Sequence, residues 1–587
     1  MADVARPVMP ALRRAVSLGL AAGLAVVMIG AVGMLEAFSR RDVVTDLVSL
    51  GRLTVAAIIL VAGFEASRVR SAERDRVRTG SALTLPSGVL AGVSAGILLA
   101  GFVLLVETID VRDVFQSITP RMLAVLTFEF EDPGLGALAL VAGGAFLGLL
   151  GSILAILPPL ARRSLVSGLV AVLLISLMEP FLRVMLVQLD LNDLAGFIYE
   201  SGGLRLESAL LIFALVAVAA ASWDRQGGAL RARMAGLPKT QRRSIDLVVV
   251  ALVGLFLLVL PQIVGSFLSE VLGTVGLYIL LGLGLNIVVG FAGLLDLGYV
   301  AFYAVGAYST AVLTSLALDT QLSFWLALPI VIAIAALAGL MIGAPVLRLR
   351  GDYLAIVTLG FGEIARILAI SDWMEPVLGG AQGILGVPAP SVLGITFRDP
   401  QTLYYVILAF CVVAALIAIS LADSRVGRAW NAMREDEQVA EATGINTTNY
   451  KLLAFATGGV FGCLAGALFA VKIGSVFAQS FPLLVSITAL ALIILGGMGS
   501  IAGVIVGAIV LVGLPELLRE FAEFRLLIYG AVLVGMMLLR PEGLLPSATR
   551  RRELHHEEEP EEQYADDAGM ASGAPVITTA RSGGSGS

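Results

Sequence analysis

The chain has 587 residues, of which 58% are hydrophobic and only 14% are charged, whereas soluble domains contain about 45–50% apolar and about 25% charged residues. The net charge of −6 owes much to an acidic C-terminal tail, so a nucleic-acid partner is not expected. Apolar runs of about 20 residues recur along the chain without the alternating pattern of a membrane β-barrel, which predicts an all-α, polytopic transmembrane helical bundle in a lipid bilayer.

The first predicted elements are membrane spans over residues 16–35, 43–64, 86–106, 137–160, 164–188 and 206–223. The first is expected to be a span and not a signal peptide, because no small-residue cleavage site follows it. Segments 68–78 and 224–243 are basic, and the positive-inside rule places such loops in the cytoplasm. Residues 1–243 are therefore predicted to form an N-terminal membrane module of about six helices that ends in a basic cytoplasmic linker.

A second module is predicted over residues 244–548. Its expected spans are 245–268, 271–291, 297–318, 323–346, 352–370, 402–420, 450–474 and 524–540. Residues 482–518 are too long for one span and contain the helix-breaking glycines Gly496, Gly497 and Gly499, which predicts a broken or hairpin helix pair. Such a pair places the basic C-terminal end in the cytoplasm. Residues 549–587 are expected to be a disordered acidic tail that ends in an added linker, "SGGSGS".

Soluble-enzyme signals are missing from the sequence. It contains no GxxxxGK[ST] phosphate loop, so the chain is not expected to bind ATP or any other cofactor itself. "GGMGS" at 496–500 is better explained as a helix break than as a phosphate cradle, because no lysine accompanies it. His555 and His556 lie in the tail, and Cys411 and Cys463 are predicted to be buried hydrophobes, so no metal site and no catalytic residue is expected.

Polar residues at membrane depth are costly, and each is therefore a candidate for the translocation path. The first group is Asn286, Asp296 and Tyr299, which interrupt a glycine-rich apolar run. A broken helix there would expose backbone groups to a polar solute. The alternative is a short turn near 292–297 that places Asp296 at the surface.

The second polar group lies on the predicted span 352–370, which follows a turn and helix cap at Gly351 and Asp352. It contains Thr358, Glu363 and Arg366. Glu363 and Arg366 are three residues apart and can pair on one helical face, which is the structural explanation. The functional explanation is that Thr358 and Glu363 line the translocation path.

The segment 427–444 is charged and lies between two uncharged stretches. Counting spans from the basic edge at Arg348 and Arg350 places it in the cytoplasm. Its alanines and glutamates favour a short helix that stops at Gly444, with Thr447 as cap of the next span. Acidic residues outnumber the nearby arginines, so a docking helix explains the segment better than a loop retained by positive charge.

Several ordered motifs resemble the permease subunits of branched-chain amino acid ABC transporters. They are "GLNIVVGFAGLLDLGYVAFYAVGAYSTAVL", "LRGDYLAIVTLGFGEIARI", "MREDEQVAEATGIN" and "IILGGMGSIAGVIVGA". Together they cover roughly residues 245–545, and the N-terminal module is longer than the leader usual in this family. The resemblance implies that 427–444 is the coupling helix, on which ATPase subunits act through Arg434, Glu437, Glu441, Ala442 and Gly444.

The resemblance also implies the cargo, the partners and the compartment. These are a branched-chain amino acid, separate ABC ATPase subunits that use ATP, a second permease subunit, and a periplasmic binding protein that docks on the loop 371–390, all at a bacterial inner membrane. A relative that imports urea, short amides or other amino acids remains an alternative. So does an ion-coupled secondary transporter that uses Asp296 and Glu363 as ion sites.

Overall fold

The computed structural model describes residues 8–68, 84–109, 117–128, 132–200, 202–235, 239–316, 321–346 and 351–517, together with single residues and short stretches between and beyond these ranges up to 546. The predicted tail 549–587 and most of the basic segment 68–78 lie outside the described residues, as does part of the predicted span 524–540. In the described part, 12 helices are long and apolar enough to cross a membrane. The predicted fold class, a polytopic helical bundle with a broken helix pair near 482–518, is confirmed.

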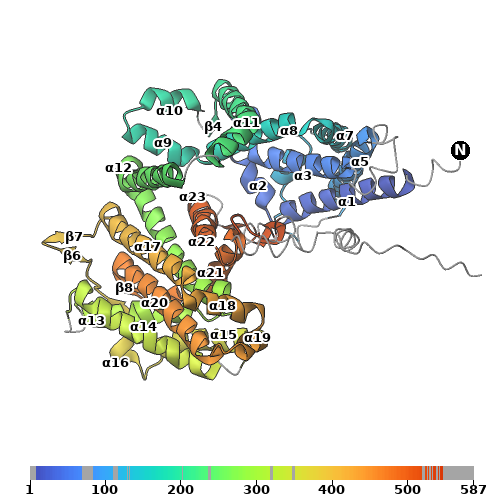
Figure 1. The fold of residues 1–587 in the computed structure, drawn as a ribbon. Coiled ribbons are helices and arrows are strands. Elements are labelled where there is room, and N and C mark those ends of the chain that lie inside the picture. The colour runs from blue at the N-terminus through green and yellow to red at the C-terminus, as the bar shows by residue number, and fades with distance from the viewer. Residues whose placement is uncertain are drawn as a thin grey trace, which may run out of the picture. The chain divides into compact units, whose positions relative to one another are not determined.

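The chain divides into two compact units, residues 1–268 with 517–525, and residues 269–516 with 526–587. The helices of the first unit are α1 (Val8–Ala31), α2 (Met34–Ser39), α3 (Leu50–Ser67), α5 (Thr84–Thr108), α6 (Pro120–Leu126), α7 (Pro133–Ile156), α8 (Pro159–Leu177), α9 (Glu179–Gln188), α10 (Asn192–Ile198) and α11 (Leu206–Ala235) (Figure 1). Its strands are β1 (Asp42–Val44), β2 (Val48–Ser49), β3 (Tyr199–Glu200) and β4 (Gly203–Leu204), in the sheet order β2-β1-β4-β3.

Two predicted spans of the first unit are wrong in detail. The span expected over 43–64 begins only at Leu50, because the preceding residues form the β1–β2 hairpin and Ser49 caps α3 by accepting from the Arg52 N–H. The span expected over 164–188 is split at Met178 into α8 and α9. Pro180 stands in the first turn of α9 and cannot continue the ladder of α8.

Helices α5 and α7 pack backbone to backbone along a face of glycines. A Cβ at Gly92 would overlap the carbonyl of Gly144, and a Cβ at Gly148 would overlap that of Gly88. The hydroxyls of Ser67 and Ser152 lie 2.9 Å apart at one end of this face. Close approach of small residues is a main source of helix association in lipid, where apolar side chains gain little by leaving the hydrocarbon.

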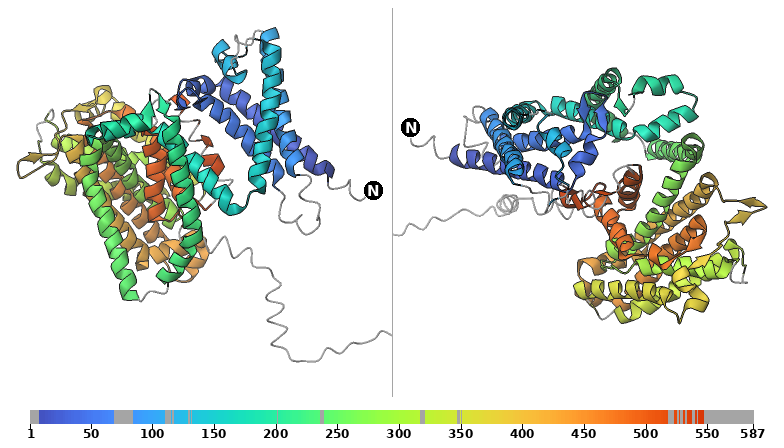
Figure 2. Two further views of the ribbon diagram at one scale, coloured as in Figure 1. Left: turned by 90° about the horizontal axis from the view of Figure 1, so that it is seen from above. Right: turned by 180° about the vertical axis from the view of Figure 1, so that it is seen from behind.

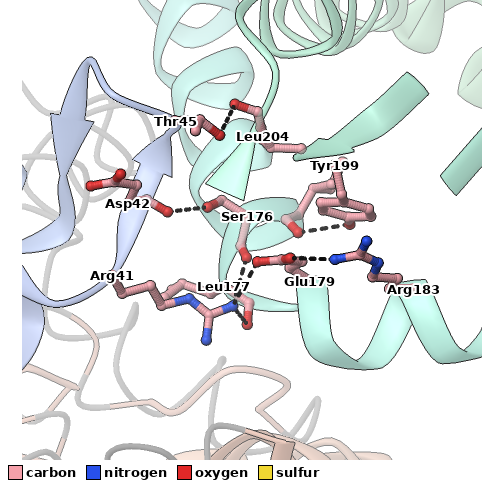
Figure 3. A network of polar contacts seen from close by, with 10 residues as sticks. Arg41, Asp42, Thr45, Ser176, Leu177, Glu179, Arg183, Tyr199 and Leu204 are labelled. Atoms are coloured by element: carbon pink, nitrogen blue, oxygen red, sulfur yellow. Dashed lines mark hydrogen bonds and ion pairs between the residues drawn. The ribbon is translucent and has the colours of Figure 1, made fainter. Parts of the chain in front are cut away.

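A buried polar network joins β1 to the break between α8 and α9 (Figure 3). Arg41 donates to the carbonyls of Ser176 and Leu177 at 3.0 and 3.2 Å, and its guanidinium lies 3.9 Å from the Glu179 carboxylate. These carbonyls belong to the last two residues of α8, where the regular ladder of helix bonds ends. Tyr199 donates to the carbonyl of Ile175 at 3.0 Å. Arg41 thus closes the end of α8 while Glu179 balances its charge.

Replacing Arg41 by methionine is expected to lower the free energy of unfolding of the first unit by about 3 kcal/mol, because it leaves the Glu179 carboxylate and two helix-terminal carbonyls buried without this donor. Arg183→Met is the matched control, since Arg183 contacts the same carboxylate from a half-exposed position and should cost about 1 kcal/mol or less. Thermal unfolding of the full chain in detergent measures both. Equal melting temperatures for the two variants would contradict the expectation.

The stretch predicted as the linker 224–243 is largely helical. Helix α11 runs on to Ala235, and α12 (Lys239–Leu285) begins at Lys239. The predicted spans 245–268 and 271–291 are merged in α12, which kinks at Gly265, where φ is 75° and ψ is −176°. The boundary between the two compact units falls in α12 just after this kink, between Leu268 and Ser269, whereas the sequence analysis places the module boundary at 243.

The second unit continues from the end of α12 into a π-helix, η1 (Asn286–Phe291). Its further helices are α13 (Val300–Thr314), α14 (Phe324–Val346), α15 (Asp352–Ile370), α16 (Glu375–Leu378), η2 (Gly380–Gln382), α17 (Pro400–Asp423), α18 (Arg425–Glu435), α19 (Glu437–Ala442), α20 (Thr447–Ile473), η3 (Ala478–Ser480), α21 (Leu483–Gly496), α22 (Ile501–Ala508), η4 (Ile509–Gly513) and α23 (Leu514–Leu517). Its strands are β5 (Ile384–Leu385), β6 (Ser391–Val392), β7 (Ile395–Thr396) and β8 (Ser475–Val476), paired β5 with β8 and β6 with β7.

Helix α20 forms the core of this unit and contacts α13, α14 and α17. In Figure 2 the orange C-terminal helices lie among the green and yellow ones. Glycines again allow close contact, because a Cβ at Gly306 would overlap the carbonyl of Cys463 and one at Gly466 would overlap that of Tyr303. Asn446, not the predicted Thr447, caps α20 by accepting from the Asn449 N–H at 3.0 Å.

Candidate functional site

The predicted coupling segment 427–444 forms two helices and not one. Ser424 caps α18 by accepting from the N–H groups of Val426 and Gly427. Asp436 interrupts the helix with an extended backbone and caps α19, accepting from Gln438 and Val439 at 2.8 and 3.1 Å. The interruption was missed because an aspartate inside a run of helix formers looks like one more surface charge.

One face of the α18–α19 pair is bonded to the helices of the second unit. Trp430 is fully buried and donates its indole N–H to the carbonyl of Tyr450 at 2.8 Å. Glu437 pairs with the buried Lys451 at 2.6 Å. Arg434 donates to the carbonyl of Gly290 at 2.8 Å, and Gly290 belongs to η1. The predicted coupling residues Arg434 and Glu437 therefore point inward, toward the second unit itself.

The other three predicted coupling residues, Glu441, Ala442 and Gly444, are exposed at the end of α19. Gly444 adopts a left-handed conformation with φ of 94° and its N–H donates to the Glu441 carbonyl, while the Ile445 N–H donates to that of Ala440. This is the Schellman ending, which favours glycine. Val439 is 58% exposed on the same short helix. Val439, Glu441 and Ala442 thus form a small exposed surface, apolar and acidic, on a helix whose opposite side is bonded to the rest of the unit.

The predicted path residues Asn286, Asp296, Tyr299 and Thr358 gather around η1 and the segment that follows it, residues 292–299, which we call the buried loop. Tyr299 donates its hydroxyl to the carbonyl of Gly458 in α20 at 2.6 Å. Asn286 is fully buried and its Oδ1 accepts from the Gly499 N–H at 2.9 Å. These two bonds join the buried loop to α20 and η1 to the glycine break.

Asp296 is only 1% exposed, so the alternative that placed it at the surface is wrong. Its Oδ1 accepts from the Gly298 N–H at 2.9 Å, and the hydroxyl of Thr358 accepts from the Leu297 N–H at 3.1 Å. The Oδ2 of Asp296 has no hydrogen-bond partner among the described residues. The carboxylate thus closes a local turn just before α13, whose N-cap residue Tyr299 makes no side-chain capping bond.

Glu363 lies apart from this group, on a partly exposed part of α15. Its Oε2 accepts from Nε of Arg366 at 3.0 Å. This is the ion pair on one helical face that the structural explanation predicts. Both side chains are about a third exposed. The turn and cap predicted at Gly351 and Asp352 stand at the start of α15, where Gly351 is the N-cap residue and Asp352 the first residue of the helix.

The predicted glycine break lies between α21 and α22. Helix α21 ends at Gly496, and Gly497 and Gly499 take positive φ values of 119° and 77°. Ser500 caps α22 by accepting from the Gly503 N–H at 3.1 Å. The N–H groups of Leu544 and Leu545 donate to the carbonyls of Leu495 and Gly496, both at 2.9 Å. Sequence reasoning missed this C-terminal closure, because no local pattern marks residues that pair with a helix end.

The second unit corresponds to a known family. A family model described as branched-chain amino acid transport system / permease component matches residues 267–539. The chain is 44% identical over 293 residues to the high-affinity branched-chain amino acid transport system permease protein LivM of Escherichia coli K12, an alignment that covers 46% of this chain and 68% of the relative. The chain belongs to this permease family.

LivM of Salmonella typhimurium matches this permease with the same identity and coverage, and LivH of that organism is 26% identical over 289 residues, 46% of this chain and 91% of the relative. No solved structure matches the chain. The matched region contains the α18–α19 pair, η1 and the glycine break, while residues 1–266 lie outside it. With its membrane-spanning helices, the permease is a multi-pass membrane protein and a transport subunit.

No cluster of three or more His, Cys, Asp or Glu able to hold a metal occurs in the described ranges. Cys411 and Cys463 are buried free thiols that donate to the carbonyls of Gly276 and Phe302. Sequence reasoning also missed the roles of Lys451, Trp430 and Ser486. The Ser486 hydroxyl accepts a hydrogen bond from the Val300 N–H at 2.9 Å. For Lys451 the sequence offered one signal, a lysine at the start of an apolar span that follows Glu437, its partner, by 14 residues.

Proposed function

We propose that this permease is the membrane-spanning subunit of an ATP-driven importer of branched-chain amino acids in a bacterial inner membrane. A periplasmic binding protein delivers the amino acid, a second permease subunit completes the pathway, and separate ABC ATPase subunits hydrolyse ATP. The C-terminus and the α18–α19 pair face the cytoplasm. The named cargo of the 44% identical LivM proteins supports the choice of substrate.

The observation that carries the proposal is the two-sided character of the α18–α19 pair. Trp430, Arg434 and Glu437 fix one side to the permease, and Glu441, Ala442 and Gly444 stand free of the core on the other. A rigid, exposed helix end of this kind suits a partner that must push the membrane helices. Closure of ATPase subunits is such a motion, and it can drive a two-state change in the packed spans.

A reconstituted complex tests the proposal. The chain is purified with an ATPase pair and a second permease of the family and placed in vesicles with ATP inside and a loaded binding protein outside. Uptake of labelled leucine should require ATP and the binding protein and should persist when ionophores collapse ion gradients. Uptake that survives without ATP and disappears with the gradient would instead support ion coupling through Asp296 or Glu363. Labelled urea or a short amide taken up in place of leucine would support the alternative cargo.

A further inference from the structure

The last turn of the first helix in the permease unit is a π-helix. In η1 the backbone is wider than in an α-helix, and the Ala292 N–H donates to the carbonyl of Ile287, five residues earlier, at 3.1 Å. The Leu294 N–H then reaches back to Val288 at 3.0 Å. Such turns are less stable than an α-helix and persist where neighbouring groups hold them.

The first group that holds η1 comes from the α18–α19 pair. Gly290 is the second-last residue of η1, and carbonyls at a helix end have no partner within the helix. Arg434 donates to this carbonyl at 2.8 Å, a bond strengthened by its charge. A Cβ at Gly293 would lie 2.9 Å from Cγ of Arg434, so the stem of the arginine packs directly on the buried loop.

The second group that holds η1 is the glycine break. Asn286, the first residue of η1, accepts from the Gly499 N–H at 2.9 Å. A Cβ at Gly290 would overlap Oδ1 of Asn286 and lie 2.8 Å from that same N–H. The two ends of one turn of chain are thus bonded to two different parts of the unit, the helix pair and the point where α21 and α22 meet.

The buried loop and Val300, the first residue of α13, extend these connections to α15 and to a second point on α21. Leu297 donates to Thr358 of α15, and Val300 donates to Ser486 of α21. Any change in the length of the turn at η1 therefore moves groups that α15 and α21 hold. Tightening a π-turn to an α-turn removes one residue from the wide turn, which shifts the following chain by about 1.5 Å and about 100° around the axis.

We propose that η1 is the element that transmits movement of the α18–α19 pair to the broken helix α21–α22, with Arg434 and Asn286 as the positioning residues at its two ends. This inference rests on the proposed function, because transmission presupposes an ATPase that moves the pair. Arg434 thereby acts on the transport step within the permease and not on ATPase docking. Such coupling requires a turn with two stable conformations, and contacts at both of its ends must be able to shift the equilibrium between them.

The variant Arg434→Ala in the reconstituted complex tests the inference through the number of amino acids taken up per ATP hydrolysed. We expect the ATPase subunits to co-purify normally and to hydrolyse ATP, while uptake per ATP falls at least about tenfold, since one bond from a charged donor is lost. Arg434→Lys should restore part of the ratio, because lysine can still donate to the Gly290 carbonyl. Arg428→Ala removes a charge from the exposed side of the same helix and should leave the ratio unchanged.

Asn286→Ala tests the opposite end of η1, and the same loss of uptake per ATP is expected with the ATPase still bound. A wild-type ratio in either folded variant overturns the inference, as does loss of ATPase binding in Arg434→Ala, which would make Arg434 a docking residue. In both cases the wild-type complex still imports with ATP and the proposed function stands. If the wild-type complex itself shows no ATP-driven uptake, the proposed function fails and the inference fails with it.

Discussion

Replacing Glu441 by arginine is expected to reduce ATP-driven uptake by an order of magnitude or more and to weaken co-purification of the ATPase subunits. Glu441 is exposed on α19, and the described hydrogen bonds of the α18–α19 pair to the core leave this side chain on the opposite face. Reversing its charge changes the surface offered to a partner, because like charges at an interface disfavour association strongly. The fold of the permease should not change.

The control for this variant is Glu207→Arg, the same charge reversal at an exposed position in the first unit. Its uptake and ATPase binding should equal those of the wild type. Melting temperature and elution volume in detergent establish that both variants fold. Normal co-purification and normal uptake by Glu441→Arg would count decisively against α19 as the docking element.

Replacing Gly298 by alanine is expected to destabilise the permease unit by about 3 kcal/mol or more. A Cβ at this position would overlap the backbone carbonyl of Thr358. The obstacle is main chain of α15 and not a flexible side chain, so the buried loop or the helix has to move, and overpacking of this kind is costly. The bonds of Leu297 to Thr358 and of Val300 to Ser486 would be displaced with it.

Gly360→Ala is the matched control, because it lies on α15 and a Cβ there meets no atom within 4 Å. Alanine in a helix interior is more stable than glycine by about 1 kcal/mol, so this variant should melt at the wild-type temperature or slightly above it. Thermal unfolding and the fraction of monodisperse protein measure the difference. If the Gly298→Ala protein were as stable as the wild type, the loop could accommodate a Cβ at this position, and the expectation would be wrong.

Helix boundaries could be predicted where the sequence changes character sharply. The span expected at 352–370 coincides with Asp352–Ile370, and that at 402–420 lies within Pro400–Asp423, because charged residues or the Asp399–Pro400 pair mark their ends. The π-helix could not be predicted. Whether Asn286–Phe291 forms α or π bonds depends on donors from Arg434 and Gly499, which are more than 140 residues away.

The sequence predicts only in part which charged residues of the candidate site point inward. Trp430 and Met433 mark the buried face of α18, and Arg434 follows Trp430 by four residues, so it shares that face. Helical spacing therefore contained the signal that Arg434 points inward. The environment of Asp296 held no such signal, because burial of a loop residue is decided by the helices that cover it.

The bonds from Leu544 and Leu545 to the end of α21 bear on the order of synthesis. A nascent chain that has been made only as far as residue 543 has already inserted α21, yet two of its terminal carbonyls lack their donors. Unpaired backbone groups are costly in hydrocarbon, so the broken helix cannot reach its final packing until the ribosome has added Leu544 and Leu545. A premature stop at codon 544 would therefore impair membrane assembly of a segment made 50 residues earlier, and not merely shorten the protein.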